Sequence, residues 1–183
     1  MLKAADIPNA ICVLRILAIA PIVWALGAGR FGLALVLVAL AGVSDAIDGY
    51  LAKRYGWCSR IGGLLDPLAD KLLLVSLFVT LAWLGLIPVW LAAVVIARDL
   101  VIVSGGLSYN LLIAPVQPEP SAASKLNTAA QLVCIASVLS REVFALPIEP
   151  LITVSGAAVL VTSVVSGLDY VIRWSSRAVS GGA

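Results

Sequence analysis

Six apolar stretches, each about 20 residues long, constrain most strongly what this chain can fold into. A helix of about 20 apolar residues crosses the hydrocarbon core of a bilayer, so each stretch predicts a transmembrane helix. The predicted spans run from Ile7 to Gly27, Phe31 to Lys53, Gly63 to Leu86, Val89 to Ile113, Ala122 to Ala145 and Leu151 to Trp174. The sequence therefore predicts an all-α, polytopic membrane protein whose residues 1–183 form one domain.

Composition supports the membrane class and excludes others. The chain is 62% hydrophobic and only 12% charged, which is too apolar for a soluble domain. A net charge of +2, with no basic run longer than Lys53-Arg54, does not suit a nucleic-acid-binding protein. Cys12, Cys58 and Cys134 are odd in number and form no CxxC pair, so neither a disulfide framework nor a zinc site is expected. The first apolar run lacks a cleavage site, and no cleaved signal peptide is expected.

Basic residues divide unevenly between the two sides of the predicted spans. Seven lie on one side, namely Lys3, Lys53, Arg54, Arg60, Lys125, Arg173 and Arg177, and two on the other, Arg30 and Arg141. An excess of lysine and arginine marks the cytoplasmic side, so we expect both termini in the cytoplasm, at a bacterial inner membrane. Arg15, Lys71 and Arg98 remain inside spans, where they should face the protein interior and could bind an anion.

Four aspartates lie around the connection between the second and third spans: Asp45, Asp48, Asp66 and Asp70. Members of each pair are three or four residues apart, so they project from one helix face, about 60° or 40° apart. A short connection should fold the two helices antiparallel and bring all four carboxylates together. Carboxylates near bilayer depth are costly unless something neutralises them. The pattern therefore predicts an acidic site at the cytoplasmic leaflet.

The chemistry of this acidic site indicates divalent cations. The chain has no histidine, and oxygen-only ligands favour Mg²⁺ or Mn²⁺ over zinc. Two ions could share the site, bind a diphosphate, and leave one carboxylate to accept a proton from an alcohol. One alternative is that the aspartates form ion pairs with Arg54, Arg60 and Lys71. Another is a cation transporter or channel, although the aspartates lie at one end of the spans and the two halves show no repeat.

The segment from Asp45 to Asp70 resembles the signature of the CDP-alcohol phosphatidyltransferase family, D-x2-D-G-x2-A-R-x8-G-x3-D-x3-D. Every element is in register except that Lys53 stands where the family usually has arginine, with Arg54 next to it. The resemblance implies a six-helix membrane enzyme, typically a homodimer, in which an alcohol displaces CMP from a CDP-linked lipid with the help of two divalent ions.

The same resemblance implies a role for each residue of the motif. Asp45, Asp48 and Asp66 would bind metal, and Asp70 would be both a metal ligand and the general base. A CDP pocket would be formed by Gly49, Ala52, Lys53 and Gly62, with Asp45 and Asp66 near the ribose and diphosphate. In the first span, Asn9 and Arg15 resemble the polar pair of members that make anionic phospholipids.

The fourth and fifth spans resemble the eukaryotic-type cardiolipin synthases of this family, which show R-D and then S-K-x-N-T, as at Arg98-Asp99 and Ser124 to Thr128. The related phosphatidylglycerophosphate synthases tend to show R-E and G-K-x-K-T. This comparison favours phosphatidylglycerol as the acceptor, with glycerol 3-phosphate as the alternative. Both carry a phosphate, and the candidates to bind it are Arg15, Arg60, Arg98, Lys125 and Asn127. Snorkelling of the long basic side chains is the structural alternative.

Overall fold

The computed structural model describes the backbone of residues 7–55, 62–112 and 122–180, all of it in helices or short connections. Side chains are described within those ranges except at 7–11, 45–55, 62–67, 106–112, 171 and 173–180. The helices are α1 (Ile7–Gly27), α2 (Phe31–Tyr55), α3 (Gly62–Trp83), α4 (Val89–Leu112), α5 (Ala122–Phe144) and α6 (Glu149–Ser180). The described residues contain no strand, which confirms the all-α class, and each predicted span coincides with one helix.

Two glycines with a left-handed backbone conformation, Gly29 and Gly85, terminate α1 and α3. Gly29 and Gly85 have φ of 69° and 71°, a left-handed conformation that glycine adopts without a steric penalty. After α1, the Arg30 N–H donates to the Ala25 carbonyl at 2.8 Å and the Gly29 N–H to the Leu26 carbonyl at 3.0 Å, which is the Schellman arrangement. The same arrangement at Gly85 explains why α3 ends before the predicted Leu86.

The first turn of α6 corrects one predicted boundary. We expect the span to begin at Leu151, after Pro147 and Pro150, but α6 begins at Glu149 and includes Pro150. Proline is tolerated there because a backbone N–H in the first turn has no partner within the helix. At the preceding connection, Ala145 adopts a φ of 50° directly after the last residue of α5.

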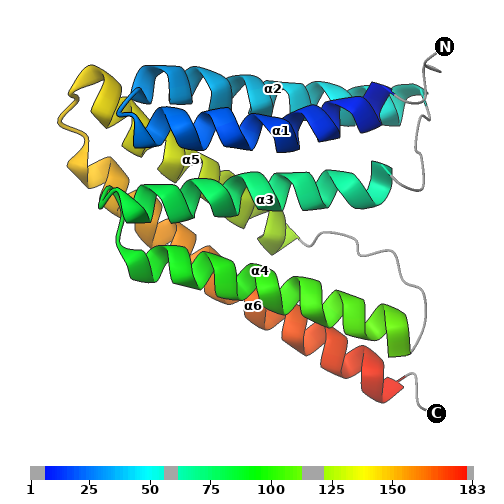
Figure 1. Ribbon diagram of the computed structural model, residues 1–183. Helices are drawn as coiled ribbons and strands as arrows, with labels where there is room; N and C mark the ends of the chain where they lie inside the picture. The colour runs from blue at the N-terminus through cyan, green and yellow to red at the C-terminus, as the bar shows by residue number, and fades with distance from the viewer. Residues whose placement is uncertain (1–6, 56–61, 113–121, 181–183) are drawn as a thin grey trace. The chain divides into compact units, whose positions relative to one another are not determined.

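Contacts divide the chain into two compact units. Unit 1 is Met1–Leu86 with Leu139–Leu146, and unit 2 is Ile87–Val138 with Pro147–Ala183. In unit 1, α1 packs against both α2 and α3 (Figure 1). Ile22 and Leu26 of α1 and Phe78 of α3 are fully buried there. Ala34 of α2 is fully buried as well.

In unit 2, α4 packs along α6 (Figure 1). Gly156 and Gly167 of α6 face α4: a Cβ at Gly156 would lie 3.6 Å from Leu91 Cδ2, and one at Gly167 would lie 3.8 Å from Arg98 Cγ, both ordinary van der Waals contacts. Val95 of α4 and Val159 of α6 are fully buried in this unit. The core of unit 2 also contains polar side chains, most of them on α5 and α6.

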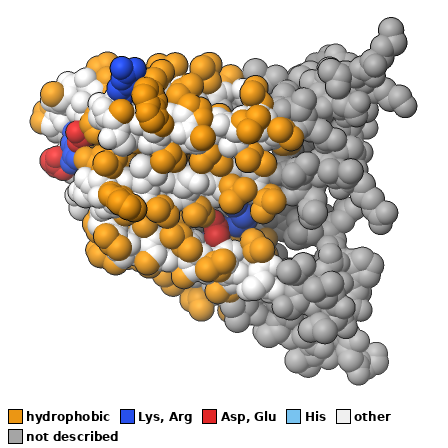
Figure 2. All heavy atoms as spheres, viewed as in Figure 1, with side chains coloured by type: hydrophobic (Ala, Val, Ile, Leu, Met, Phe, Trp, Pro, Cys, Tyr) orange, Lys and Arg blue, Asp and Glu red, His pale blue; other side chains and the backbone are white. Residues whose placement is uncertain are grey.

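Both units expose many large apolar side chains, and polar or charged side chains are also found in the interior. Leu14, Trp83 and Val154 are exposed, whereas Arg98 and Gln131 are buried. On the face that Figure 2 shows, hydrophobic side chains are spread widely over the described part, with only a few charged groups. An extensive exposed apolar surface marks contact with a partner or a membrane.

Helix length and composition point the same way. Among the described residues, Ala122–Phe144 and Glu149–Tyr170 are long and apolar enough to cross a membrane, and Cys12–Gly27 and Phe31–Ser44 are shorter apolar segments. These features suggest a membrane protein. Six complete crossings and the single domain remain predictions.

Candidate functional site

An ion pair between α1 and α3 lies at the centre of the candidate site in unit 1. Arg15 Nη1 donates a hydrogen bond to Asp70 Oδ1, and the two residues are 55 positions apart in the sequence. The Arg15 side chain is 1% exposed, whereas that of Asp70 is 40% exposed. Packing of α1 on α3 thus holds a buried guanidinium behind a carboxylate that solvent reaches.

The other three motif aspartates lie on helical backbone in the same unit. Asp45 and Asp48 are on α2, and Asp66 is on α3, one turn before Asp70. Their side chains lie outside the described set, as do those of the predicted nucleotide-binding residues Gly49, Ala52, Lys53 and Gly62. The described side chains include no group of three potential metal ligands. Convergence of the four carboxylates therefore remains a prediction.

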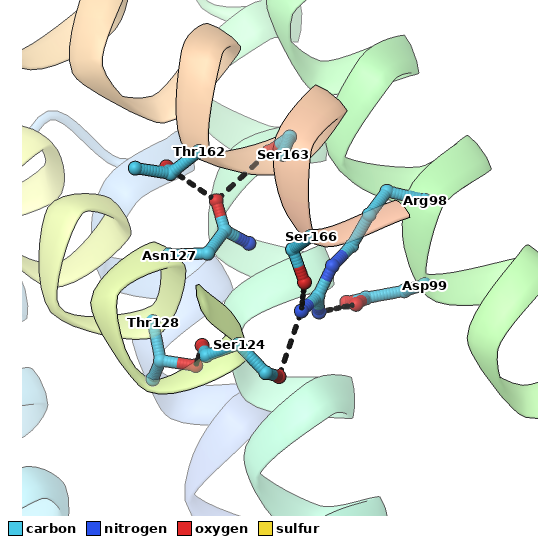
Figure 3. A network of polar contacts seen from close by, with 8 residues as sticks. All are labelled: Arg98, Asp99, Ser124, Asn127, Thr128, Thr162, Ser163 and Ser166. Carbon is cyan, nitrogen blue, oxygen red and sulfur yellow. Dashed lines mark hydrogen bonds and ion pairs between the residues drawn. The ribbon is translucent and has the colours of Figure 1, made fainter. Parts of the chain in front are cut away.

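A second polar cluster ties together three helices of unit 2 (Figure 3). The buried guanidinium of Arg98, on α4, donates to Asp99 Oδ1 at 2.6 Å, Ser124 Oγ at 2.7 Å and Ser166 Oγ at 2.6 Å. Ser124 lies on α5 and Ser166 on α6. Arg98 therefore connects the fourth, fifth and sixth helices with charge-assisted hydrogen bonds.

Asn127 extends this cluster by one turn of α5. Its Oδ1 lies 2.9 Å from Thr162 Oγ1 and 2.9 Å from Ser163 Oγ, both on α6 (Figure 3). Three buried N–H donors on α4 and α5 have no acceptor among the described residues, namely Arg98 Nε, Asn127 Nδ2 and Gln131 Nε2. Such donors are costly to bury unless an oxygen-bearing group or water satisfies them.

The five candidates for phosphate binding do not all belong to one described cluster. Arg98 and Asn127 belong to the same cluster in unit 2, and Lys125, on α5 between Ser124 and Asn127, is exposed. Arg15 lies in unit 1, paired with Asp70. Arg60 lies outside the described residues.

Sequence reasoning missed most of the hydroxyl groups in the cluster. Ser163 and Ser166 are fully buried, and neither is among the predicted site residues. The signal was present, because polar residues recur at helical spacing in two apolar spans, at 124, 127 and 131 and again at 155, 163 and 166. A polar stripe in an apolar span is expected to face the protein interior.

Comparison with known proteins identifies the family. The family model described as CDP-alcohol phosphatidyltransferase matches residues 5–168. The chain belongs to the CDP-alcohol phosphatidyltransferase family. This match confirms the resemblance drawn from the aspartate motif, and the family region includes all of the motif as well as Arg98 and Asn127.

Named relatives in the family fall into two groups. A probable cardiolipin synthase (CMP-forming) of Drosophila melanogaster is 30% identical, over 91% of this chain and 57% of that protein. The cardiolipin synthase (CMP-forming) of Homo sapiens is 34% identical, over 75% of this chain and 51% of that protein. A probable phosphatidylglycerophosphate synthase of Mycobacterium tuberculosis is 33% identical, over 93% of this chain and 82% of that protein. The chain thus spans little more than half the length of the two cardiolipin synthases.

A solved structure supports the fold. The crystal structure of Mycobacterium tuberculosis phosphatidylinositol phosphate synthase with CDP-DAG bound matches with a TM-score of 0.64 and 15% identity, covering 91% of this chain and 85% of that chain. This likeness shows that the protein has the helical fold of the family.

Proposed function

We propose that this protein is an integral membrane phosphatidyltransferase that makes cardiolipin from CDP-diacylglycerol and phosphatidylglycerol. The observation that carries the proposal is the complete aspartate motif, in register inside the family match, with Asp70 held by the buried Arg15. In the reaction, a hydroxyl oxygen of phosphatidylglycerol bonds to the phosphorus that carries diacylglycerol. The bond from that phosphorus to the CMP oxygen breaks, and the hydroxyl proton passes to Asp70.

Asp70 suits the role of general base for two reasons. A base must come within hydrogen-bonding reach of the proton it takes, and the Asp70 side chain is 40% exposed. Its position on α3 is also fixed by buried neighbours, since Ala69 and Leu73 are both part of the core. Rigid helical positions hold catalytic groups more accurately than loops do.

The donor set of the motif fits two Mg²⁺ or Mn²⁺ ions. The candidate ligands are the oxygen-only side chains of Asp45, Asp48, Asp66 and Asp70, and the chain contains no histidine that would favour zinc. When bound, such ions offset the negative charge of a diphosphate and of the leaving phosphate. In this proposal, the cytidine diphosphate lies against Gly49, Ala52, Lys53 and Gly62, with Asp45 and Asp66 near its ribose and diphosphate.

The preference for phosphatidylglycerol rests on the R-D and S-K-x-N-T segments, which resemble those of cardiolipin synthases. Identity alone does not separate the two acceptors, because the named relatives differ by only a few per cent. The R-D and S-K-x-N-T segments are joined through the 2.7 Å hydrogen bond from Arg98 to Ser124, so they act as one structural unit. We propose that the acceptor phosphate binds at the exposed Lys125, with Arg60 as a further candidate, and that the buried Arg98 and Asn127 hold the part of α5 that carries Lys125. The enzyme is proposed to be a homodimer with its active site facing the cytoplasm of a bacterial inner membrane.

An assay with one acceptor at a time tests this function. Purified protein receives CDP-diacylglycerol and Mn²⁺, together with either phosphatidylglycerol or glycerol 3-phosphate, and lipid products are identified by mass spectrometry. We expect cardiolipin from phosphatidylglycerol, release of CMP, and no product once the metal is chelated. Product from glycerol 3-phosphate alone would show instead that the protein is a phosphatidylglycerophosphate synthase. Transfer that persists without any divalent metal would contradict the proposed role of the aspartates.

A further inference from the structure

The reaction as described so far gives the buried guanidinium of Arg15 no contact with a substrate. From the sequence, Arg15 is a candidate to bind the acceptor phosphate. In the structure its side chain is only 1% exposed, and its described partner is a carboxylate of the protein itself. A substrate phosphate has no surface of this guanidinium to bind, so the geometry points to a role inside the protein.

The two ends of this ion pair lie in different surroundings. A buried guanidinium is strongly unfavourable without a counter-charge, and Asp70 supplies one. The carboxylate itself remains 40% exposed, so it stays within reach of solvent and of a bound molecule. A charge-assisted hydrogen bond from Nη1 to Oδ1 restricts rotation of the carboxylate. Arg15 thus restrains the Asp70 carboxylate from the protein interior.

We propose that Arg15 is a positioning residue, which fixes the carboxylate of Asp70 in the orientation needed for proton transfer and does not contact the acceptor. This inference rests on the proposed function, in which Asp70 is the general base. A misplacement of about 1 Å can cost about 100-fold in rate, so a restraint on the base affects catalysis directly. Supporting contacts of this kind fix the rotamers of catalytic groups in many sites.

The proposal predicts a specific division of kinetic effects. A residue that binds the acceptor phosphate in the ground state raises the acceptor KM when it is removed. A residue that only orients the base lowers kcat and leaves the acceptor KM unchanged. Arg15→Met should therefore lower kcat by about 10- to 100-fold, with the KM for phosphatidylglycerol within about 2-fold of wild type.

Two further variants serve as rescue and control. Arg15→Lys keeps the charge but loses the planar fork of donors, so it should recover part of the lost kcat. Arg141→Met removes an arginine from a different ion pair, with Glu142 at 2.7 Å, and should leave kcat within about 2-fold of wild type. An unchanged kcat in Arg15→Met, or a raised acceptor KM in that variant, would overturn the positioning role. No recovery in Arg15→Lys would also count against it.

A measurement that needs neither metal nor turnover tests the pair itself. Thermal unfolding in detergent, without divalent ions, is compared for wild type, Arg15→Met, Asp70→Asn and the double variant. If Arg15 holds Asp70, the double variant should lose clearly less stability than the two single losses added together. Additive losses would overturn the inference. If wild type transfers to no acceptor while the losses are non-additive, the proposed function fails but Arg15 still holds Asp70.

Discussion

Two buried arginines, Arg15 in unit 1 and Arg98 in unit 2, receive their counter-charges in opposite ways. Arg15 pairs with Asp70, which lies on another helix and is 40% exposed. Arg98 pairs with its buried neighbour in sequence, Asp99, and gives its remaining described hydrogen bonds to Ser124 and Ser166. One arginine thus supports a carboxylate that solvent reaches, and the other joins three helices from within.

The difference separates a catalytic support from a structural connection. A carboxylate with an exposed side can take part in chemistry, so loss of its arginine should affect rate more than folding. Arg98 is buried and bonds to the buried Asp99 and Ser166, so it should matter for helix packing, because its removal takes away the hydrogen bonds that join α4 to α5 and α6. The two sites should therefore respond differently to matched substitutions.

The largest effect, on turnover, is expected from substitution of Asp70, the partly exposed member of the Arg15–Asp70 pair. Asp70→Asn should lower turnover by at least about 1,000-fold, because an amide cannot accept the proton of the alcohol. CDP-diacylglycerol binding should remain measurable by thermal shift, whereas Asp45→Asn and Asp48→Asn should weaken metal and nucleotide binding together. Equal loss of binding in all three variants would remove the distinction between base and metal ligand.

The next largest effect should appear in stability. Arg98→Met should lower the free energy of unfolding by about 3 kcal/mol, because the variant loses a buried ion pair and the hydrogen bonds from α4 to α5 and α6. Unfolding in detergent measures the loss, and Arg141→Met, in a partly exposed pair, should change it by less than about 1 kcal/mol. An Arg98→Met protein as stable as wild type would show that Arg98 does not hold the three helices together.

The smallest effect concerns a single hydroxyl. Ser166→Ala removes one buried acceptor from Arg98 and should lower the unfolding free energy by about 1 kcal/mol. Ser137→Ala is the matched control, since the Ser137 hydroxyl donates to the Val133 carbonyl of its own helix at 2.8 Å. If the two variants lose the same free energy of unfolding, the hydrogen bond from Arg98 to Ser166 contributes no additional stability.

Local patterns in the sequence were sufficient to predict the six helices and to identify the family. Apolar runs of about 20 residues placed all six, and the spacing of the aspartates identified the motif. Boundaries were less certain, because Pro150 reads as a helix breaker and yet lies in the first turn of α6. The sequence also marked Arg15 and Arg98 as buried charges, whereas Lys71, marked in the same way, is only half-buried.

Partners between helices could not be predicted in the same way. Spacing shows which residues share a helix face, but it does not show which other helix that face meets. Arg15 and Asp70 are 55 residues apart, and Arg98 and Ser166 are 68 apart. Only the packing of α1 on α3, and of α4 on α6, brings these groups together. The function of a buried charge depends on that packing, so Arg15 could be read as a phosphate ligand from sequence alone.

The stacking of Arg30 over Trp24, 5.3 Å from the ring centroid, has a consequence for depth in the bilayer. Tryptophan favours the headgroup level, and Arg15 lies nine residues away from Trp24, about 14 Å along α1. If the proposed membrane enzyme holds Trp24 at one headgroup level, Arg15 lies about halfway through the hydrocarbon core, and water would reach Asp70 from the other side of the membrane. In vesicles of shorter-chain lipids the path of water through the membrane to Asp70 is shorter. Membrane thickness therefore offers an experimental control over the hydration of Asp70.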